Sequence, residues 1–220
     1  CTCPICGQIL SLKNNEGVMT LVCGNPACEG KFINKLDHFC SKKGLDIKGL
    51  SKATLEKLIN WGFVNNYEDI FKLKNVKSQW AKKPGFGMKS VENILNAIED
   101  AKHTTLDKVI SAAGIPLIGM TVAKDLNKKF DSYESFREAV NKKFDFSVFN
   151  GYGPEMNKSI LSFDYSEIDK IVVNYLIIEK PMEEEKEQTL EGKVFVITGK
   201  LKNYKNRDEL KQQIEAFGGR

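Results

Sequence analysis

Six cysteines lie within the first 40 residues of this 220-residue chain, and four of them have the spacing of a metal site. They form two close pairs, Cys3 with Cys6 and Cys23 with Cys28, and glycine and proline occupy the turns of both pairs. Zinc binds four thiolates in a tetrahedron, and two such pairs on tight turns provide that geometry with little strain. We therefore predict a structural zinc ion bound by Cys3, Cys6, Cys23 and Cys28.

Disulfide bonds between the same cysteines are the alternative, but they are typical of secreted mini-domains, and residues 41–220 contain no cysteine. A catalytic zinc is disfavoured because such a site keeps one coordination position open. Cys1 is an alternative ligand to Cys3. Cys40 lies beyond the pairs and is expected to be a buried, small apolar residue, and His38 to be a packing residue on a helix.

Apolar and polar residues alternate in the segment between the two cysteine pairs, which predicts a short β-hairpin over residues 8–22 with its tip at 14–17. A unit of this size has almost no core, so a bound metal would supply most of its folding free energy. We assign residues 1–30 to this four-cysteine zinc finger.

Residues 31–180 have apolar residues at helical spacing, interrupted by four similar turns. The turns cover residues 47–51, 83–87, 115–119 and 149–153, so their last residues are 36, 32 and 34 positions apart. The segments that follow them have helical patterns, over residues 53–60, 89–101, 121–130 and 155–163. The repeat predicts four helix-hairpin-helix units, near residues 45–62, 83–102, 111–130 and 149–163.

In such a unit the glycines permit positive φ or close approach, and the apolar residue between them packs inward between the helices. Backbone N–H groups then point outward at the start of the second helix, where the helix dipole also favours an anion. Lysines in or near the first helical turns add positive charge, namely Lys52, Lys89, Lys124 and Lys158. Such groups would hold the sugar-phosphate backbone of DNA without reading its sequence.

The candidate DNA-binding residues are Gly49, Ser51, Lys52, Gly85, Phe86, Gly87, Lys89, Gly119, Thr121, Gly151, Gly153 and Lys158. The four turns are unequal. Ser51 replaces the second glycine of the first turn, and Leu117 replaces the first glycine of the third. We expect these two units to be more structural than phosphate-binding. Pro154 removes one amide donor from the fourth unit.

Charge is distributed in the direction that DNA binding requires. The first 110 residues contain 16 lysines against 11 acidic residues, whereas residues 111–180 contain nine basic and ten acidic residues. None of the three arginines lies in the first half, which disfavours the reading of base edges. No apolar stretch approaches the roughly 20 residues of a membrane helix. The composition, 41% hydrophobic and 28% charged, is that of an ordinary globular protein.

The last 40 residues predict a different organisation. Residues 181–190 are acidic and interrupted by proline, which indicates a linker. Residues 192–199 predict a buried strand and residues 206–217 an amphipathic helix. One strand and one helix bury too little surface to be stable alone, so residues 191–220 would be an incomplete α/β module. With no initial Met and no secretory pattern, the chain is expected to be a piece of a longer polypeptide.

This order of parts resembles the C-terminal half of bacterial NAD-dependent DNA ligases, with residues 191–220 similar to the start of their BRCT domain. The matching stretches are Cys3-Pro-Ile-Cys6-Gly7, Cys23-Gly-Asn25-Pro-Ala-Cys28, His38-Phe39-Cys-Ser41, Asp46-Ile47-Lys-Gly49-Leu50, Gly85-Phe-Gly87-Met-Lys89-Ser90 with Asn93, Gly114-Ile115 with Gly119 and Ala123, Thr198-Gly199 and Gly218-Gly219. The fold class expected is thus mainly α: a zinc knuckle, a helix-hairpin-helix domain and a truncated BRCT module. Ser51, Val91 and Asn157 depart from the family pattern, which calls for glycine or a small residue there.

Enzymes of this family transfer the adenylyl group of NAD to their own lysine and then to the 5′-phosphate at a nick, and they use Mg²⁺. The resemblance implies that this chain grips nicked duplex DNA from the minor-groove side in a bacterial cytoplasmic enzyme of replication and repair. The family's adenylated lysine lies in a Lys-x-Asp-Gly motif that the sequence lacks. The resemblance therefore implies no catalytic residue here, and NAD and Mg²⁺ bound by adenylation domains outside this chain. The alternatives are the DNA-binding tail of another repair enzyme and a zinc-containing protein-interaction scaffold.

Overall fold

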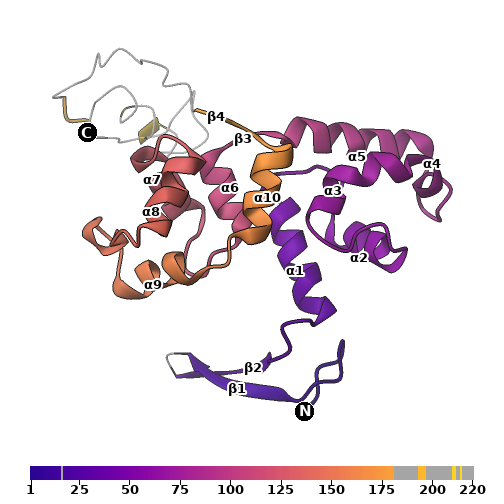
Figure 1. Ribbon diagram of the computed structural model, residues 1–220, viewed down its shortest axis with the longest axis horizontal. Coiled ribbons are helices and arrows are strands. Elements are labelled where there is room, and N and C mark those ends of the chain that lie inside the picture. Colours follow the sequence, from indigo (N-terminus) through magenta and orange to yellow (C-terminus); the bar gives the residue numbers. More distant parts are fainter. Residues whose placement is uncertain (16, 181–192, 197–209, 212–213, 215–220) are drawn as a thin grey trace. The chain divides into compact units, whose positions relative to one another are not determined.

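The turns between helices determine most of this architecture, because glycine or serine residues there end one element and begin the next. The computed structural model describes residues 1–15, 17–180, 193–196, 210–211 and 214. The chain divides into two units, Cys1–Lys180 and Pro181–Arg220. The first unit is mainly helical and begins with a small β-hairpin, which confirms the predicted fold class for this part (Figure 1).

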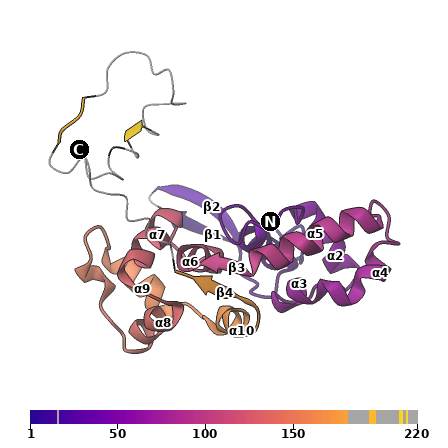
Figure 2. The same ribbon diagram turned by 90° about the horizontal axis from the view of Figure 1, so that it is seen from above.

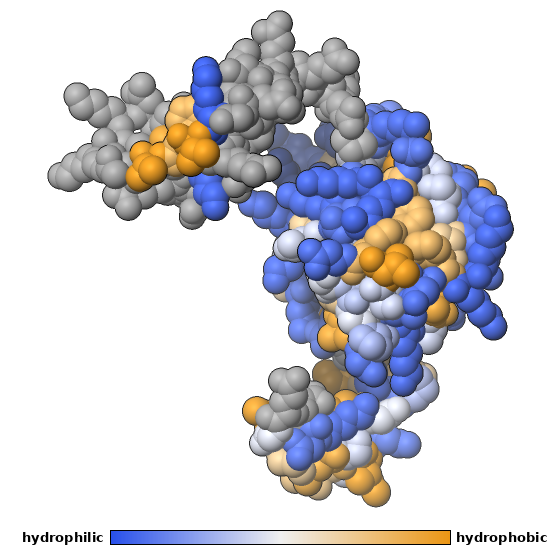
Figure 3. Space-filling model, turned by 90° about the vertical axis from the view of Figure 1, so that its left-hand side faces the viewer, coloured by the Kyte–Doolittle hydropathy of each residue, from blue (hydrophilic) through white to orange (hydrophobic). Residues whose placement is uncertain are grey.

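The hairpin pairs β1 (Leu10–Asn15) with β2 (Val18–Cys23) in antiparallel register, so that Leu12 lies opposite Leu21. Both of these leucines are exposed, and apolar side chains are visible on the surface of this module (Figure 3). Cys3 is the only buried residue among those described between positions 1 and 23. The predicted hairpin is confirmed, and it has no apolar core of its own.

Helices with short connections make up most of the remaining unit. The first half contains α1 (Glu29–Cys40), α2 (Lys52–Asn60), α3 (Glu68–Lys72), the 3-10 helix η1 (Leu73–Val76), α4 (Lys77–Trp80) and α5 (Met88–Ala101). The second half contains α6 (Leu106–Ala113), α7 (Met120–Lys129), α8 (Tyr133–Asn141), the 3-10 helix η2 (Phe146–Val148), α9 (Pro154–Ser162) and α10 (Ser166–Tyr175). The helices α2, α5, α7 and α9 begin within one residue of the predicted positions.

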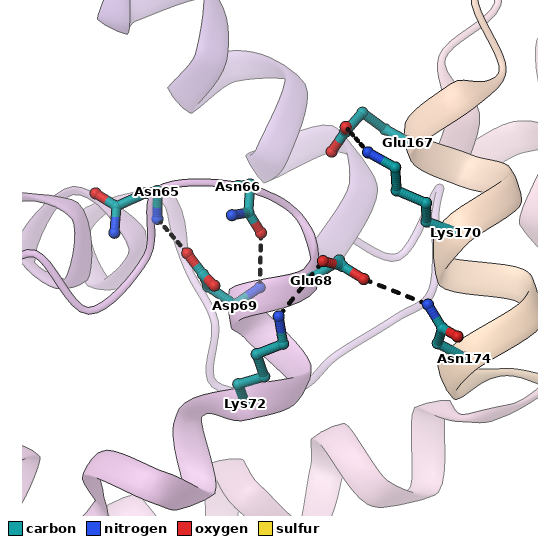
Figure 4. Close-up of polar contacts among 8 residues, drawn as sticks. All are labelled: Asn65, Asn66, Glu68, Asp69, Lys72, Glu167, Lys170 and Asn174. Carbon is teal, nitrogen blue, oxygen red and sulfur yellow. Dashed lines mark hydrogen bonds and ion pairs between the residues drawn. The ribbon is translucent and has the colours of Figure 1, made fainter.

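The last helix joins the two halves. Figures 1 and 2 both place α2–α5 on one side and α7–α9 on the other, with α10 between them. On α10, Asn174 Nδ2 lies 3.5 Å from Glu68 Oε1 of α3, and Glu68 also binds Lys72 (Figure 4). Nearby, the rings of Tyr175 and Phe71 stack with their centroids 4.9 Å apart. These contacts attach the last helix of the unit to α3 in its first half.

A short parallel sheet was not predicted. Strand β3 (His103–Thr105) pairs with β4 (Ile177–Glu179), so that residues far apart in the sequence become neighbours. Each strand has only three residues, which is too short for an alternating pattern to be recognised. The pairing closes the helical unit just before the second unit begins.

Few residues of the second unit are described. Residues 193–196 have no regular secondary structure, and Val194 and Val196 are exposed, so the prediction of a buried strand is wrong at these positions. A strand is stable only when a neighbouring strand completes its hydrogen bonds, and none pairs with these four residues within the described part of the chain. Leu210, Lys211 and Ile214 are helical and fall within the predicted helix. The predicted linker, and the rest of the BRCT-like module, lie outside the described residues.

Candidate metal centre and nucleic-acid interface

Four cysteine sulfurs meet at the base of the β-hairpin. The Sγ atoms of Cys3, Cys6, Cys23 and Cys28 all lie within 4.8 Å of one another. The Sγ of Cys3 is 3.8 Å from that of Cys28, and the Sγ of Cys6 is 3.5 Å from that of Cys23. Tetrahedral zinc with Zn–S distances of about 2.3 Å requires sulfurs about 3.8 Å apart, whereas a disulfide requires about 2.05 Å. The four residues therefore fit a thiolate-bound zinc ion.

Local backbone structure brings the four ligands together. Cys3 and Cys6 lie on a turn closed by a hydrogen bond from Gly7 N to Cys3 O, and Gly7 has a φ of 69° that favours glycine. Cys23 ends β2, and Cys28 is the N-cap residue of α1. A metal at this position would connect the hairpin directly to the first helix of the helical unit.

The thiols differ in acidity. A hydrogen bond from the backbone of Gln8, together with one from Asn25, lowers the pKa of Cys6 to about 6. The backbone of Asn25 also lowers the pKa of Cys23, but burial and the three neighbouring thiols outweigh this effect and raise it to about 11. Four thiolates this close repel one another, and a bound metal cation would offset that repulsion.

The remaining cysteines lie outside this cluster. Cys1 is exposed, and Cys40 is buried in the core, as expected. His38 is also satisfied by protein contacts, because its Nε2 lies 2.7 Å from the backbone oxygen of Ser111. The alternative ligand and the nearby histidine are therefore not brought into the metal centre.

The four predicted turns have one backbone geometry. In each turn the amide of the central apolar residue donates to the carbonyl three residues earlier, and the pairs are Leu50 to Ile47, Phe86 to Lys83, Ile118 to Ile115 and Tyr152 to Phe149. The last residue of each turn then accepts the first hydrogen bond of the next helix, from Leu55, Val91, Ala123 and Asn157 respectively. The repeat inferred from sequence spacing is therefore a repeat of structure.

The residue before the central apolar residue has a positive φ in every turn. The values are 89° at Gly49, 83° at Gly85, 67° at Leu117 and 86° at Gly151. This is the third position of a type II turn, which requires the left-handed region that glycine enters without strain. Leu117 adopts the same conformation although it is a bulky residue, so the third turn is built like the other three.

The central residues pack inward and hold the turns. Leu50, Ile118 and Tyr152 are buried, and the ring of the half-buried Phe86 contacts Trp61 and Trp80 with centroids 5.7 and 5.4 Å away. The glycine positions beside them remain on the surface. The side chain of Phe86 thus supports its turn from the inside. Backbone atoms of Gly85 and Gly87 make up much of the exposed surface of that turn.

Most amides at the starts of the second helices have no protein acceptor. In the second unit Gly87 N donates to Ser90 Oγ over 3.0 Å, but no described residue accepts from the amides of Met88, Lys89 or Ser90. In the third unit the amides from Gly119 to Val122, which include that of Thr121, have no acceptor among the described residues. These groups can bind an anion, because the helix dipole adds to their own polarity.

The first and fourth units each leave three amides without an acceptor among the described residues, as many as the second unit, but their surroundings differ. Ser51 Oγ accepts a hydrogen bond from Thr54 N, which leaves the amides of Ser51, Lys52 and Ala53 without an acceptor in the described structure. In the fourth unit Pro154 has no amide hydrogen, and Glu155 adds a negative charge to the first turn of α9. The third unit, which was expected to be more structural than phosphate-binding, therefore offers the largest set of free amides, and the fourth unit is the least suited to an anion.

The candidate lysines differ in their surroundings. Lys52 Nζ donates to Asn34 Oδ1 over 2.7 Å, so this side chain is directed toward α1. Lys89, Lys124 and Lys158 are exposed and have no ion-pair partner among the described residues. Sequence reasoning missed Lys57, whose Nζ lies 5.6 Å from the centre of the Phe86 ring. Lys57 lies on α2, in the preceding unit, and no local sequence pattern connects it with Phe86.

Two departures from the family pattern have a structural reason. Val91 is fully buried in the core. Asn157 Oδ1 accepts a hydrogen bond from Phe146 N and so caps η2. Both larger residues are accommodated by packing or by a hydrogen bond within the unit.

Comparison with known proteins finds relatives that align over the whole chain. Proteins named DNA ligase from Lachnoclostridium phytofermentans and Thermosipho africanus are 34% and 35% identical to the whole chain. A DNA ligase from Fusobacterium nucleatum is 31% identical over 99% of it. The chain is homologous to a part of DNA ligase. It spans about a third of the length of these relatives, 34%, 33% and 32% respectively.

No protein-family model matches the chain. Among its described helices, none combines the length and the apolar composition that a bilayer span requires. The aligned region covers the whole chain and so includes the cysteine cluster and all four turns.

Proposed function

We propose that this chain is the DNA-gripping part of a bacterial NAD-dependent DNA ligase. Its four turns would hold the sugar-phosphate backbone of nicked duplex DNA from the minor-groove side, without sequence specificity. Sealing of the nick, and the binding of NAD and Mg²⁺, would be carried out by adenylation domains of the same enzyme outside this chain. The enzyme would act in the bacterial cytoplasm, in replication and repair.

The observation that carries this proposal is the repeated turn with unoccupied amides. Met88, Lys89 and Ser90 are the clearest example, because no described residue accepts from their amides and the turn before them is exposed. A phosphate oxygen can accept from two or three such groups, and neutral amides give no preference for one base over another. Four turns in one unit would give the combined affinity that one turn lacks.

The zinc site would have a structural role. Its four thiolates leave no open coordination position for a substrate. Because Cys28 caps α1, the ion would fix the hairpin to the helix that leads into the first turn. We propose zinc as the occupant on the basis of the sulfur spacing and the all-thiolate ligand set.

Duplex binding at two salt concentrations tests the proposal. The zinc-loaded chain should bind intact and nicked duplexes of unrelated sequence with similar affinity. If four lysines each neutralise one phosphate, the affinity should fall roughly a hundredfold between about 50 and 200 mM salt. The matched binding-deficient variant has Gly87 replaced by valine. Its duplex affinity should be lower, because a β-branched side chain at the N-cap would block the approach of a phosphate to the amides.

The outcome distinguishes the alternatives. A protein-interaction scaffold would have no duplex affinity, and that result would contradict the proposal. Binding that depends strongly on base sequence would also contradict it. A different repair enzyme would bind duplex as well, but its longer polypeptide would lack an adenylation lysine.

A further inference from the structure

Leu117 occupies a backbone conformation that leucine rarely adopts. Its φ of 67° matches the positive φ of Gly49, Gly85 and Gly151 at the same position of the other turns. The left-handed region is uncommon for bulky residues because their Cβ approaches the neighbouring carbonyl. A residue held in such a conformation is a reason to look for a role that its side chain performs.

The Leu117 side chain does not contribute to the core. It is 61% exposed, whereas the next residue, Ile118, is 5% exposed and fills the space between the helices. Glycine would relieve the backbone strain at this position and would remove only the minor, covered part of this side chain from packing. The leucine therefore adds an apolar surface at the tip of the third turn, directly before the amides that have no acceptor.

The second turn has a comparable feature. Met88 follows the N-cap residue Gly87 and is 49% exposed, although most large apolar residues of the helical unit are buried. Leu117 thus precedes the N-cap residue of the third unit and Met88 follows that of the second, each beside amides that have no acceptor among the described residues. About half of Met88 and more than half of Leu117 are therefore accessible to a ligand.

We propose that Leu117 and Met88 contact the deoxyribose faces in the minor groove of duplex DNA. This inference rests on the proposed function. An amide that binds a phosphate oxygen brings its turn against the sugar of the same strand, and the sugar presents mainly C–H groups. Apolar side chains at the turn tip are suited to that surface, as apolar residues of other minor-groove proteins are.

Such contacts predict a component of affinity that salt does not weaken. Contacts with phosphate release counterions and so determine the slope of log affinity against log salt concentration. An apolar contact releases none, so it changes the affinity at every salt concentration by the same factor. This distinguishes a sugar contact from an additional phosphate contact.

The test replaces each residue by a polar one of similar size. Leu117→Asn is suitable because asparagine tolerates the left-handed region, and Met88→Gln retains the length of the side chain. Val173→Thr is the control, since Val173 is 81% exposed on α10 and lies outside the turns. Binding of the zinc-loaded chain to nicked duplex is measured over a series of salt concentrations, and thermal unfolding is measured in parallel.

We expect Leu117→Asn and Met88→Gln each to weaken binding roughly three- to tenfold, the effect of exposing part of a buried apolar side chain. The salt slope should not change, and Leu117→Asn should keep or raise the unfolding temperature. Equal affinity of the variants and the unmodified chain would overturn the inference and leave the proposed function intact. A changed slope would also overturn it. If the unmodified chain does not bind duplex, both fail.

Discussion

The hydroxyl of Tyr152 donates a hydrogen bond to Asp125 Oδ2 over 2.9 Å, and this bond joins the fourth turn to the second helix of the third unit. In return, Ser159 Oγ of α9 donates to Pro116 O of the third turn over 2.6 Å. Each unit of this pair therefore supports the turn of the other. Tyr152, at the centre of the fourth turn, is thus buried between the helices and also donates a hydrogen bond to the neighbouring unit.

The first two units have the same reciprocal arrangement. A Cβ on Gly49 would lie 2.7 Å from Ile94 Cγ1 of α5, so the first turn is packed against the second unit. Lys57 of α2 lies against the second turn, near Phe86. The four units are therefore two pairs, and within each pair the surfaces of both turns depend on one another.

Alkaline pH should destabilise the helical unit. Burial, followed by the hydrogen bond to Asp125, raises the pKa of Tyr152 above its usual value, and burial with Asp169 raises the pKa of Tyr133 likewise. The unfolded chain ionises these residues near pH 10 but the folded chain does not. Their contribution to stability is complete below about pH 10 and is lost as the pH rises further.

Urea unfolding between about pH 8 and 12 measures this loss. Each such tyrosine should lower the free energy of unfolding by up to about 1.4 kcal/mol per pH unit above pH 10. The free energy of unfolding of the Tyr133→Phe variant should decline less steeply with rising pH than that of the unmodified chain, because phenylalanine cannot ionise. Parallel curves for the two proteins would refute this explanation.

Local chemistry explains what the sequence could predict. The starts of α2, α5, α7 and α9 follow from the residues Ser51, Gly87, Gly119 and Gly153, because a cap residue acts on the next few residues only. The cysteine cluster was equally predictable, since two close pairs on turns determine most of its geometry.

Long-range pairing could not be predicted. The hydrogen bond between Tyr152 and Asp125, and the pairing of β3 with β4, join residues separated by 27 and about 74 positions. No periodic pattern encodes such contacts, which depend on how the helices pack. The buried strand expected near residue 194 is wrong at residues 193–196, and strand formation in general depends on partners that the strand's own sequence does not specify.

Replacing Gly85 by valine should reduce both stability and DNA binding. Its φ of 83° is strained for any side chain, and a β-branched residue would cost about 1–2 kcal/mol. The added bulk would also stand on the exposed turn, so duplex affinity should fall about tenfold or more if the turn backbone approaches phosphate closely. Thermal unfolding and duplex titration measure the two effects.

Gly62→Val is the matched control for that variant. Gly62 has a φ of 71°, and a Cβ added to it would have no atom within 4 Å, but this glycine follows α2 outside the four turns. The substitution should cost a similar free energy of unfolding and leave duplex affinity nearly unchanged. Equal losses of affinity in both variants would show that strain alone, and no contact at the turn, caused the effect.

Zinc removal should unfold the hairpin module and spare most helices. The chain should contain about one zinc ion, since four thiolates complete one tetrahedral site. Cys23→Ser should lose the metal and the hairpin, because the module has almost no buried side chains. Metal analysis and circular dichroism check both statements.

Cys1→Ser provides the control for the metal site. Cys1 is exposed and lies outside the four-sulfur cluster, so this variant should retain one zinc ion. Loss of zinc from Cys1→Ser with retention in a Cys3→Ser variant would mean that Cys1 is the ligand.

Lys89→Gln should weaken duplex binding mainly at low salt. Lys89 is exposed, lies in the first turn of α5 and has no ion-pair partner among the residues described. Removing one phosphate contact should reduce the magnitude of the salt slope by about one. Lys170→Gln changes the net charge equally, but Lys170 pairs with Glu167 on α10. An equal change of slope in both variants would indicate a general charge effect.

Direct contact between turn amides and DNA is the central claim, and amide hydrogen exchange measures that contact residue by residue. Addition of nicked duplex to the zinc-loaded chain should slow exchange at Met88, Lys89 and Ser90 and at Thr121, because phosphate oxygens would then accept from these amides. Exchange at Gly62, outside the turns, should not change. Duplex binding that leaves all four of these turn amides exchanging as fast as before would contradict the claim.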